Sequence, residues 1–378
     1  MARFLVVVGT RPEAIKMAPV IRELRGRLAH GATCVCSTGQ HREMLDQALA
    51  AFDIVPDIDL AVMQPDQTLS SLSARVLERM DQVLVDQKPE WVLVQGDTTT
   101  VTMAAIAAQH RRVRVGHVEA GLRTHDRANP FPEEMNRVLA DQMSDLCFAP
   151  TERARRNLLR EGIADARIAV TGNTAIDALL SLDEARCIPP AGHPAAQVPS
   201  GADLILVTAH RRENHDAPLR SICEALARLA CERRPGLHIV YPVHRSPHVW
   251  EPVHARLHDV PGITLLPPVE YPTLVYLMRR SRLILTDSGG IQEEAPSLRR
   301  PVLVLRDVTE RPEAVEAGAA RVVGTDTDAI VAAVAALLDE PDAYAAMTAA
   351  ENPFGDGLAA RHIVDRLLEV SGSPQEGR

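Results

Sequence analysis

Residues 4–16 read FLVVVGTRPEAIK, an unbroken apolar run followed by a glycine and a polar segment. A short continuous apolar run is typical of a parallel strand covered on both faces. Pro12 suits the first position of a helix, so the stretch predicts a strand, a tight turn and a helix. Arg11 and Lys16 place cations near the first turn of that helix, where its dipole disfavours them. They are either two solvated charges or, as we favour, contacts for an anionic ligand.

This order of strand, turn and helix recurs along the chain. Apolar runs predict two series of strands, at 4–8, 33–37, 91–95, 113–118, 146–149 and 167–171, and then at 203–208, 238–242, 263–266, 282–286, 301–305 and 320–323. Helical patterns lie between them, at 12–28, 68–86, 132–143, 216–232 and 327–338. The alternation predicts an α/β protein built on doubly wound parallel sheets.

A chain of 378 residues is too long for one ordinary core. Residues 186–201, RCIPPAGHPAAQVPSG, separate the two series of strands and resemble a linker. We therefore expect a Rossmann-like domain over 1–185 and a second over 202–355. The carboxyl ends of both sets of strands would face a central cleft, where such folds bind ligands. The last helix, within 356–378, is expected to pack back on the first domain.

Composition excludes several classes of function. A net charge of −9 without a basic run argues against nucleic-acid binding. The six cysteines form no CxxC pair, which favours free thiols in a reducing compartment over disulfides or a metal site. No apolar stretch approaches the length of a membrane span, and the first is too short for a signal peptide. We expect a cytoplasmic protein with no membrane partner.

Acidic residues follow the strands of the first half. Asp97 comes after the strand at 91–95 and Glu119 after the one at 113–118, while Glu133 and Glu134 open the next helix. Each could be only a helix cap or a partner of the helix dipole. If the two strands are neighbours, however, their carboxylates converge at one edge of the sheet. Three acidic groups in one place provide the acid and the base that proton abstraction and return require.

The strand ends of the second half carry a different set of residues: His210, Arg211, His244, Ser288, Gly289, Gly290, Glu294 and Arg311. Two glycines at the start of a helix let backbone N–H groups approach a diphosphate closely. Glu294 lies about one turn further on, where it can accept hydrogen bonds from ribose hydroxyls. This pattern predicts a site for a nucleotide sugar.

Nine segments, in order, resemble those of the non-hydrolysing UDP-N-acetylglucosamine 2-epimerases: GTRPEAIKMAP (9–19), QHREMLDQ (40–47), QGDTTT (95–100), GHVEAGLRT (116–124), PFPEEMNR (130–137), TGNTAIDAL (171–179), HRREN (210–214), DSGGIQEEAPSL (287–298) and RDVTERPEAV (306–315). The resemblance runs from the first strand to about residue 367. It implies a glycosyltransferase-B-like fold, a homodimer, and no metal or nicotinamide cofactor. It also implies elimination of UDP to an enzyme-bound 2-acetamidoglucal, followed by re-addition with inversion at carbon 2.

The resemblance further implies a role for each matching residue. The proton-transfer and charge-stabilising carboxylates are Asp97, Glu119 and Glu133, and His210 assists the departure of UDP. Ligand contacts are Arg11 and Lys16, with Ser288, Gly289, Gly290 and Arg311 at the phosphates and Glu294 at the ribose. A second site, at which substrate activates bacterial members, uses Gln40, Arg211 and His244. Arg299 departs from the pattern, because the family often has glycine there.

Three alternatives share these residues. A hydrolysing 2-epimerase would release free N-acetylmannosamine, and a glycosyltransferase of this fold would need a sugar acceptor. A nucleotide-sugar sensor would bind without turnover, but it has no need of three convergent carboxylates. The motifs at 9–19 and 116–137 favour the non-hydrolysing epimerase.

Overall fold

Two parallel β-sheets organise the protein in a computed structural model, which describes residues 2–39, 42–64, 66–199, 201–233 and 235–372. The chain divides into two compact units, each built around one sheet. Unit 1 comprises Met1–Ser181 and Phe354–Arg378, and unit 2 comprises Leu182–Pro353. The predicted class, two doubly wound α/β domains, is confirmed.

Unit 1 contains a seven-stranded parallel sheet in the order β3-β2-β1-β4-β5-β6-β7. Its elements are β1 (Phe4–Val8), α1 (Arg11–Arg27), β2 (Thr33–Ser37), α2 (Arg42–Ala50), β3 (Ile58–Asp59), α3 (Leu69–Gln87), β4 (Trp91–Gln95), α4 (Thr99–His110), β5 (Arg114–Val118), α5 (Glu133–Met143), β6 (Leu146–Ala149), α6 (Glu152–Arg160), η1 (Asp165–Arg167), β7 (Ile168–Val170), α7 (Thr174–Ser181) and α16 (Ala359–Gly372). The buried strands β1, β2, β4 and β6 have no exposed residue, which explains their unbroken apolar sequences.

Neighbouring strands bring the acidic loops of unit 1 together. β4 pairs with β5 in a register that sets Gln95 opposite Val118. Asp97 and Glu119 therefore leave adjacent strands at the same edge of the sheet. The predicted convergence of these two chain segments is confirmed, and its cause is the parallel pairing.

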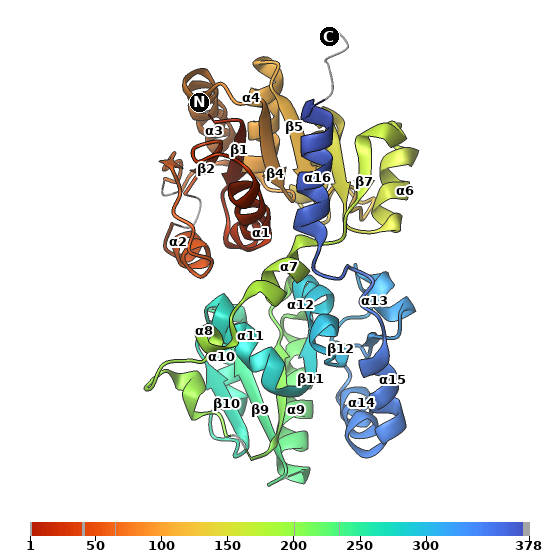
Figure 1. Ribbon diagram of the computed structural model, residues 1–378. Helices are drawn as coiled ribbons and strands as arrows, with labels where there is room; N and C mark the ends of the chain where they lie inside the picture. The colour runs from red at the N-terminus through yellow and green to blue at the C-terminus, as the bar shows by residue number, and fades with distance from the viewer. Residues whose placement is uncertain (1, 40–41, 65, 200, 234, 373–378) are drawn as a thin grey trace. The chain divides into compact units, whose positions relative to one another are not determined.

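The C-terminal helix belongs to unit 1. In Figure 1, α16 lies beside α1 on one face of the sheet, and it also contacts α7. Trp91, at the start of β4, donates its indole N–H to the hydroxyl of Ser371 over 2.9 Å. Leu367 of α16 packs over Gly116 of β5, with a methyl carbon 3.8 Å from the position of the missing Cβ, while Leu93 at 2.8 Å leaves no room for a side chain there. The last helix thus packs on β5, the strand that leads into Glu119.

Unit 2 contains a six-stranded parallel sheet in the order β10-β9-β8-β11-β12-β13. Its elements are α8 (Glu184–Cys187), η2 (Pro194–Gln197), β8 (Asp203–Thr208), η3 (Arg212–Asn214), α9 (Ala217–Glu232), β9 (Leu237–Pro242), α10 (Pro247–Leu257), β10 (Ile263–Leu266), α11 (Tyr271–Arg280), β11 (Ser281–Thr286), α12 (Gly289–Glu294), η4 (Ala295–Leu298), β12 (Val302–Val304), α13 (Pro312–Glu316), β13 (Ala320–Val322), α14 (Thr327–Asp339) and α15 (Pro341–Ala349). β8 and β11 are adjacent, so the residues after them lie at one sheet edge.

The predicted strands and helices all have counterparts in the structure. β3 was missed, because two residues at a sheet edge leave no periodic pattern. The proline-rich stretch 186–201 is not wholly irregular, since it contains the short helix η2, and α8 ends at its second residue. No helix within the described ranges is long and apolar enough to span a membrane.

Candidate active site

Glu119 directly follows β5 in a left-handed backbone conformation, with φ of 68°. Only 9% of its side chain is exposed. Lys16 of α1 forms an ion pair with Oε1, the Gln95 amide donates to Oε2, and Asn173 Nδ2 lies 3.4 Å from Oε1. A left-handed conformation is unfavourable for a non-glycine residue, and such residues cluster at functional sites. The fold therefore holds this carboxylate in one place beside a lysine.

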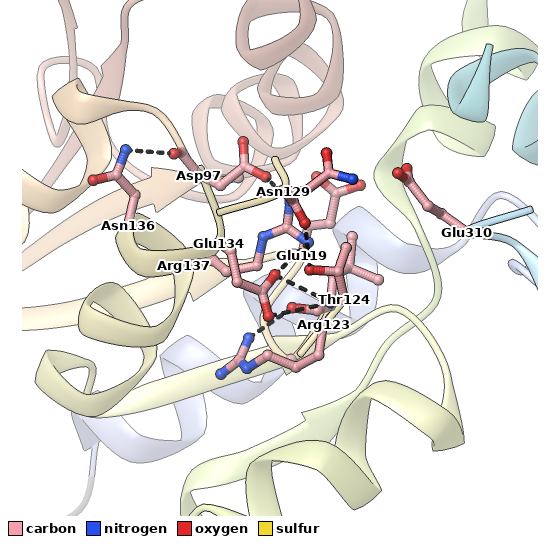
Figure 2. A network of polar contacts seen from close by, with 12 residues as sticks. Asp97, Glu119, Arg123, Thr124, Asn129, Glu134, Asn136, Arg137 and Glu310 are labelled. Atoms are coloured by element: carbon pink, nitrogen blue, oxygen red, sulfur yellow. Dashed lines mark hydrogen bonds and ion pairs between the residues drawn. The ribbon is translucent and has the colours of Figure 1, made fainter. Parts of the chain in front are cut away.

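Asp97 is not the cap of the following helix. Thr98 caps α4, accepting from the backbone N–H of Val101 over 3.5 Å. The Asp97 carboxylate instead accepts a hydrogen bond of 2.6 Å from Arg137, and its backbone carbonyl accepts one of 2.9 Å from Asn136. Both donors lie on α5, and Figure 2 shows the contact of Asn136 with Asp97. The helix-cap interpretation is wrong, and a partly exposed carboxylate is held at the sheet edge by an arginine.

The two glutamates that open α5 have different surroundings. Glu134 is buried and accepts hydrogen bonds from the backbone N–H groups of Thr124 (3.1 Å) and His125 (2.9 Å) (Figure 2). It also lies 3.5 Å from Arg137. Glu133 is half-buried, and no hydrogen bond or ion pair of its side chain is found within the described ranges. Glu134 therefore holds the loop at Thr124 and His125, while Glu133 is available to a ligand.

The turn between β1 and α1 depends on Gly9 and Glu13. A Cβ at Gly9 would lie 2.6 Å from the hydroxyl of Thr38 and 2.7 Å from that of Thr100, which leaves no room for a side chain. Glu13 accepts hydrogen bonds from the backbone N–H groups of Gly9 (2.6 Å) and Thr10 (3.3 Å). Burial raises the pKa of Glu13 to about 7, although these hydrogen bonds oppose the rise. Sequence reasoning missed this residue; its signature is a glutamate three positions after a threonine cap.

In unit 2, a buried aspartate organises the loop after β8. Asp287 follows β11 and its Oδ2 accepts from the backbone N–H groups of His210 (2.7 Å) and Arg211 (2.8 Å) and from the amide of Asn214 (3.0 Å). Its other oxygen lies 3.3 Å from Nδ1 of His210. Asp287 was not among the site residues predicted from the sequence. It fixes the backbone of His210 and faces one nitrogen of the imidazole ring.

Cationic groups surround the start of α12. The missing Cβ of Gly289 would lie 3.5 Å from Nη2 of Arg311 and 3.8 Å from Nη2 of Arg211. The rings of His210 and His244 stack, with their centroids 5.5 Å apart. Ser288 is the N-cap of α12, so its hydroxyl stands beside the glycine pair. Two guanidinium groups and a helix start attract an anion.

Glu294 ends α12 and is nearly buried. The hydroxyl of Tyr271 donates to its Oε2 over 3.2 Å, and burial beside this carboxylate raises the pKa of Tyr271 well above its usual range. The missing Cβ of Gly290 would lie 3.9 Å from Oε1 of Glu294, so a side chain at position 290 would stand beside this carboxylate, and the glycine leaves that space open. Glu293, the preceding residue, pairs with Arg311 over 2.5 Å.

The predicted site residues thus form two sets. Unit 1 holds Arg11, Lys16, Asp97, Glu119 and Glu133, and Lys16 contacts Glu119 there. Unit 2 holds His210, Arg211, His244, Ser288, Gly289, Gly290, Glu294 and Arg311. That both sets act on one ligand stays a prediction. Gln40 lies outside the described residues. Within the described part of the chain, no group of three or more His, Cys, Asp or Glu side chains is arranged to hold a metal ion.

Sequence comparison identifies the family to which these residues belong. A family model described as UDP-N-acetylglucosamine 2-epimerase matches residues 27–368. The chain belongs to the UDP-N-acetylglucosamine 2-epimerase family. A curated UDP-N-acetylglucosamine 2-epimerase of Escherichia coli (strain K12) is 51% identical over 372 residues, which cover 97% of this chain and 98% of that protein.

Solved structures agree with this family membership. The UDP-GlcNAc 2-epimerase from Neisseria meningitidis, in a crystal structure bound to UDP-GlcNAc, superposes with a TM-score of 0.89 at 46% identity, covering 97% of this chain and 99% of that one. A glycosyltransferase from Rickettsia africae, at 14% identity and a TM-score of 0.61 over 99% of both chains, shares the fold alone. The 2-epimerase family and the glycosyltransferase-B-like fold implied by the motifs are confirmed.

Proposed function

We propose that this chain interconverts UDP-N-acetylglucosamine and UDP-N-acetylmannosamine without hydrolysis. The observation that carries the proposal is the carboxylate Glu119, held beside Lys16 at the sheet edge from which Asp97 also emerges. In a 2-epimerase, such groups have a defined task. They remove the proton at carbon 2 and return one to the opposite face.

The reaction needs more than a base, because carbon 2 is not adjacent to a carbonyl and no enolate can form. We infer that the bond between carbon 1 and the UDP oxygen breaks as the proton leaves, giving 2-acetamidoglucal and UDP. Positive charge develops on the sugar ring while the bond to the UDP oxygen breaks, before the proton has fully left, and the carboxylates of Asp97, Glu119 and Glu133 stabilise it. Re-addition of the UDP oxygen at carbon 1 and of a proton at carbon 2 gives the epimer.

Unit 2 supplies the groups suited to UDP. Arg311 faces the glycine at the start of α12 and is assigned to stabilise the negative charge on a departing diphosphate. His210, held by Asp287, stands at the same sheet edge and is assigned to assist UDP departure. Glu294, oriented by Tyr271, is assigned to the ribose hydroxyls. Metal and nicotinamide cofactors have no part in this proposal.

The deciding experiment is incubation of the protein with UDP-N-acetylglucosamine alone in deuterated water, followed by mass spectrometry and NMR of the products. We expect UDP-N-acetylmannosamine carrying deuterium at carbon 2. Free N-acetylmannosamine in its place identifies a hydrolysing enzyme. Unchanged substrate that reacts only when a sugar acceptor is added identifies a glycosyltransferase. Tight binding without turnover under either condition identifies a sensor.

A pair of substitutions separates the roles of the neighbours Glu133 and Glu134. Glu133→Gln is expected to lower kcat by about 100-fold or more, with little change in thermal stability, because no contact within the described ranges depends on its charge. Glu134→Gln is expected to cost about 1–3 kcal/mol of stability, because charged hydrogen bonds to the backbone of Thr124 and His125 are weakened. Steady-state kinetics and thermal unfolding measure both. Near-normal turnover of Glu133→Gln would remove that residue from the mechanism.

We also propose a second ligand site, a dimeric state and a cytoplasmic location. Arg211 and His244 lie beside His210, so substrate bound near them would influence the catalytic loop. Gln40 completes this proposed regulatory set. The free cysteines within the described ranges, five of them buried, suit a reducing compartment. Sedimentation tests the dimer, and strictly hyperbolic kinetics for wild type and His244→Ala would contradict activation by substrate.

A further inference from the structure

A buried chain of charged side chains lies behind the loops that carry Asp97 and Glu119. Nδ1 of His117 lies 2.6 Å from Oδ1 of Asp141, and Nε2 lies 2.7 Å from the backbone oxygen of Gly96. The other oxygen of Asp141 accepts from Arg123 over 2.6 Å. His117 and Asp141 are fully buried, and the Arg123 side chain is 1% exposed.

The partners of His117 fix its charge. A carboxylate and a peptide carbonyl only accept hydrogen bonds, so both ring nitrogens of His117 carry a proton and the ring is an imidazolium. Burial disfavours this charge, but the attraction and hydrogen bond of Asp141 outweigh it and raise the pKa of His117. Arg123 also pairs with Glu161 over 2.6 Å, so two positive and two negative groups balance.

Each contact of His117 leads to one of the proposed catalytic carboxylates. His117 hydrogen-bonds to the carbonyl of Gly96, the residue immediately before Asp97. The backbone N–H of Gly96 in turn donates to the backbone oxygen of Val118 over 3.1 Å. Gly96 has a φ of 81°, and its missing Cβ would lie 3.8 Å from Oε2 of Glu119. The imidazolium is therefore hydrogen-bonded to the carbonyl of the residue before Asp97, and it lies two residues before Glu119 in the chain.

Asp141 fixes the far end of the same loop. Its Oδ2 accepts from the backbone N–H of Gly121 over 3.2 Å, in addition to Arg123. The residues on either side of Glu119 are thus tied to one buried carboxylate, through His117 on one side and through Gly121 on the other. Because these groups are buried, water does not compete for the hydrogen bonds.

We propose that His117, paired with Asp141, is a positioning residue that fixes the spacing between Asp97 and Glu119. This inference rests on the proposed epimerase function. Removing a proton from one face of carbon 2 and delivering a proton to the opposite face needs both carboxylates in register with the sugar. A displacement of about 1 Å in such a site can cost about 100-fold in rate.

Two substitutions at His117 test the separate contacts. In His117→Gln the amide nitrogen reaches roughly where Nε2 stood and can still donate to Gly96. In His117→Asn it reaches roughly where Nδ1 stood and can donate only to Asp141. We expect kcat to fall about 10-fold in the glutamine variant and about 100-fold in the asparagine variant. KM and the affinity for UDP, measured calorimetrically, should stay within about twofold, because unit 2 is assigned to UDP binding.

Asp145→Asn is the matched control. Asp145 accepts from Val115 at the opposite end of β5 over 2.8 Å, so the substitution disturbs the same strand away from the site. All variants are assayed below the onset of their thermal unfolding, and kcat of the control should equal that of wild type. Should neither His117 variant fold, Asp141→Asn keeps the side-chain volume and is expected to lower kcat about 10-fold at unchanged KM.

The outcomes separate this inference from the proposed function. A wild-type protein that does not epimerise UDP-N-acetylglucosamine overturns both. An active wild type together with near-normal kcat in the His117 variants, or in Asp141→Asn where they do not fold, overturns only the positioning role. Equal losses in the glutamine and asparagine variants, matched by the control, would reduce His117 to a packing residue.

Discussion

Glu119→Gln is expected to lower kcat by about 1,000-fold while the dissociation constant for UDP stays unchanged. The substitution keeps the size of the side chain but removes the negative charge that pairs with Lys16. A neutral amide neither accepts a proton nor stabilises positive charge on the sugar ring. Because UDP binding is assigned to unit 2, titration calorimetry with UDP should give the wild-type value.

Glu90→Gln is the control for this substitution. Glu90 immediately precedes β4 and therefore lies at the N-terminal end of the strands, opposite to the end at which Glu119 lies. It pairs with Arg3 over 2.9 Å, and 47% of its side chain is exposed. Exposed ion pairs contribute little to stability, so this variant should keep wild-type kcat. Turnover of Glu119→Gln close to that of Glu90→Gln would contradict a catalytic role for Glu119.

The strands and their order of appearance were predictable from the sequence because burial on both faces demands continuous apolar runs. The runs at 4–8, 33–37, 91–95 and 203–208 coincide with β1, β2, β4 and β8. The edge strand β3 has only two residues, one half-buried and one exposed, and gives no such run. The runs at 146–149 and 263–266 likewise coincide with β6 and β10, and the other predicted strand and helix boundaries differ by one residue at most, as the ends of such elements do.

The candidate site was predictable only as far as strand ends identify it. Asp97 and Glu119 each follow a strand, and this position predicted that they lie at one edge of the sheet. It did not predict the contact of Asp97 with Arg137, which lies 40 residues further along the chain. Glu133 and Glu134 are indistinguishable by spacing. Their difference appears only when the first turn of α5 packs against the loop at Thr124.

Buried charges are the part that sequence could not reveal. His117 occupies β5, where a polar residue interrupts an apolar run, and its partner Asp141 comes 24 residues later on α5. Asp287 likewise contacts a loop 77 residues earlier. Such pairs depend on which strands and helices become neighbours, and local patterns do not contain that information.

A departure from the family pattern has a clear conformational explanation. Arg299 stands where the family resemblance implies glycine, and it adopts a left-handed conformation with φ of 53° at the end of η4. Glycine reaches this region without steric cost, whereas an arginine there costs roughly 1–2 kcal/mol. The backbone conformation at Arg299 therefore explains the glycine that the family resemblance implies there.

Gly121→Ala is expected to destabilise the protein by about 4 kcal/mol, about 1 from its left-handed backbone and about 3 from overpacking. Gly121 has a φ of 84° in the loop that carries Glu119. A Cβ there would overlap the backbone oxygen of Ala154 and lie 2.9 Å from both its carbonyl carbon and Cγ of Leu158. The backbone of α6 cannot move aside without breaking its own hydrogen bonds.

Gly162→Ala separates the two contributions to that loss. Gly162 has a φ of 83°, almost the same as that of Gly121, but a Cβ there would meet nothing within 4 Å. This variant should lose only about 1 kcal/mol, the cost of the left-handed backbone. In thermal unfolding followed by circular dichroism, Tm should therefore be lower by about 3 °C for Gly162→Ala and by about 10 °C or more for Gly121→Ala. Equal shifts would mean that close packing against α6 does not hold the Glu119 loop, and that backbone conformation alone makes Gly121 necessary.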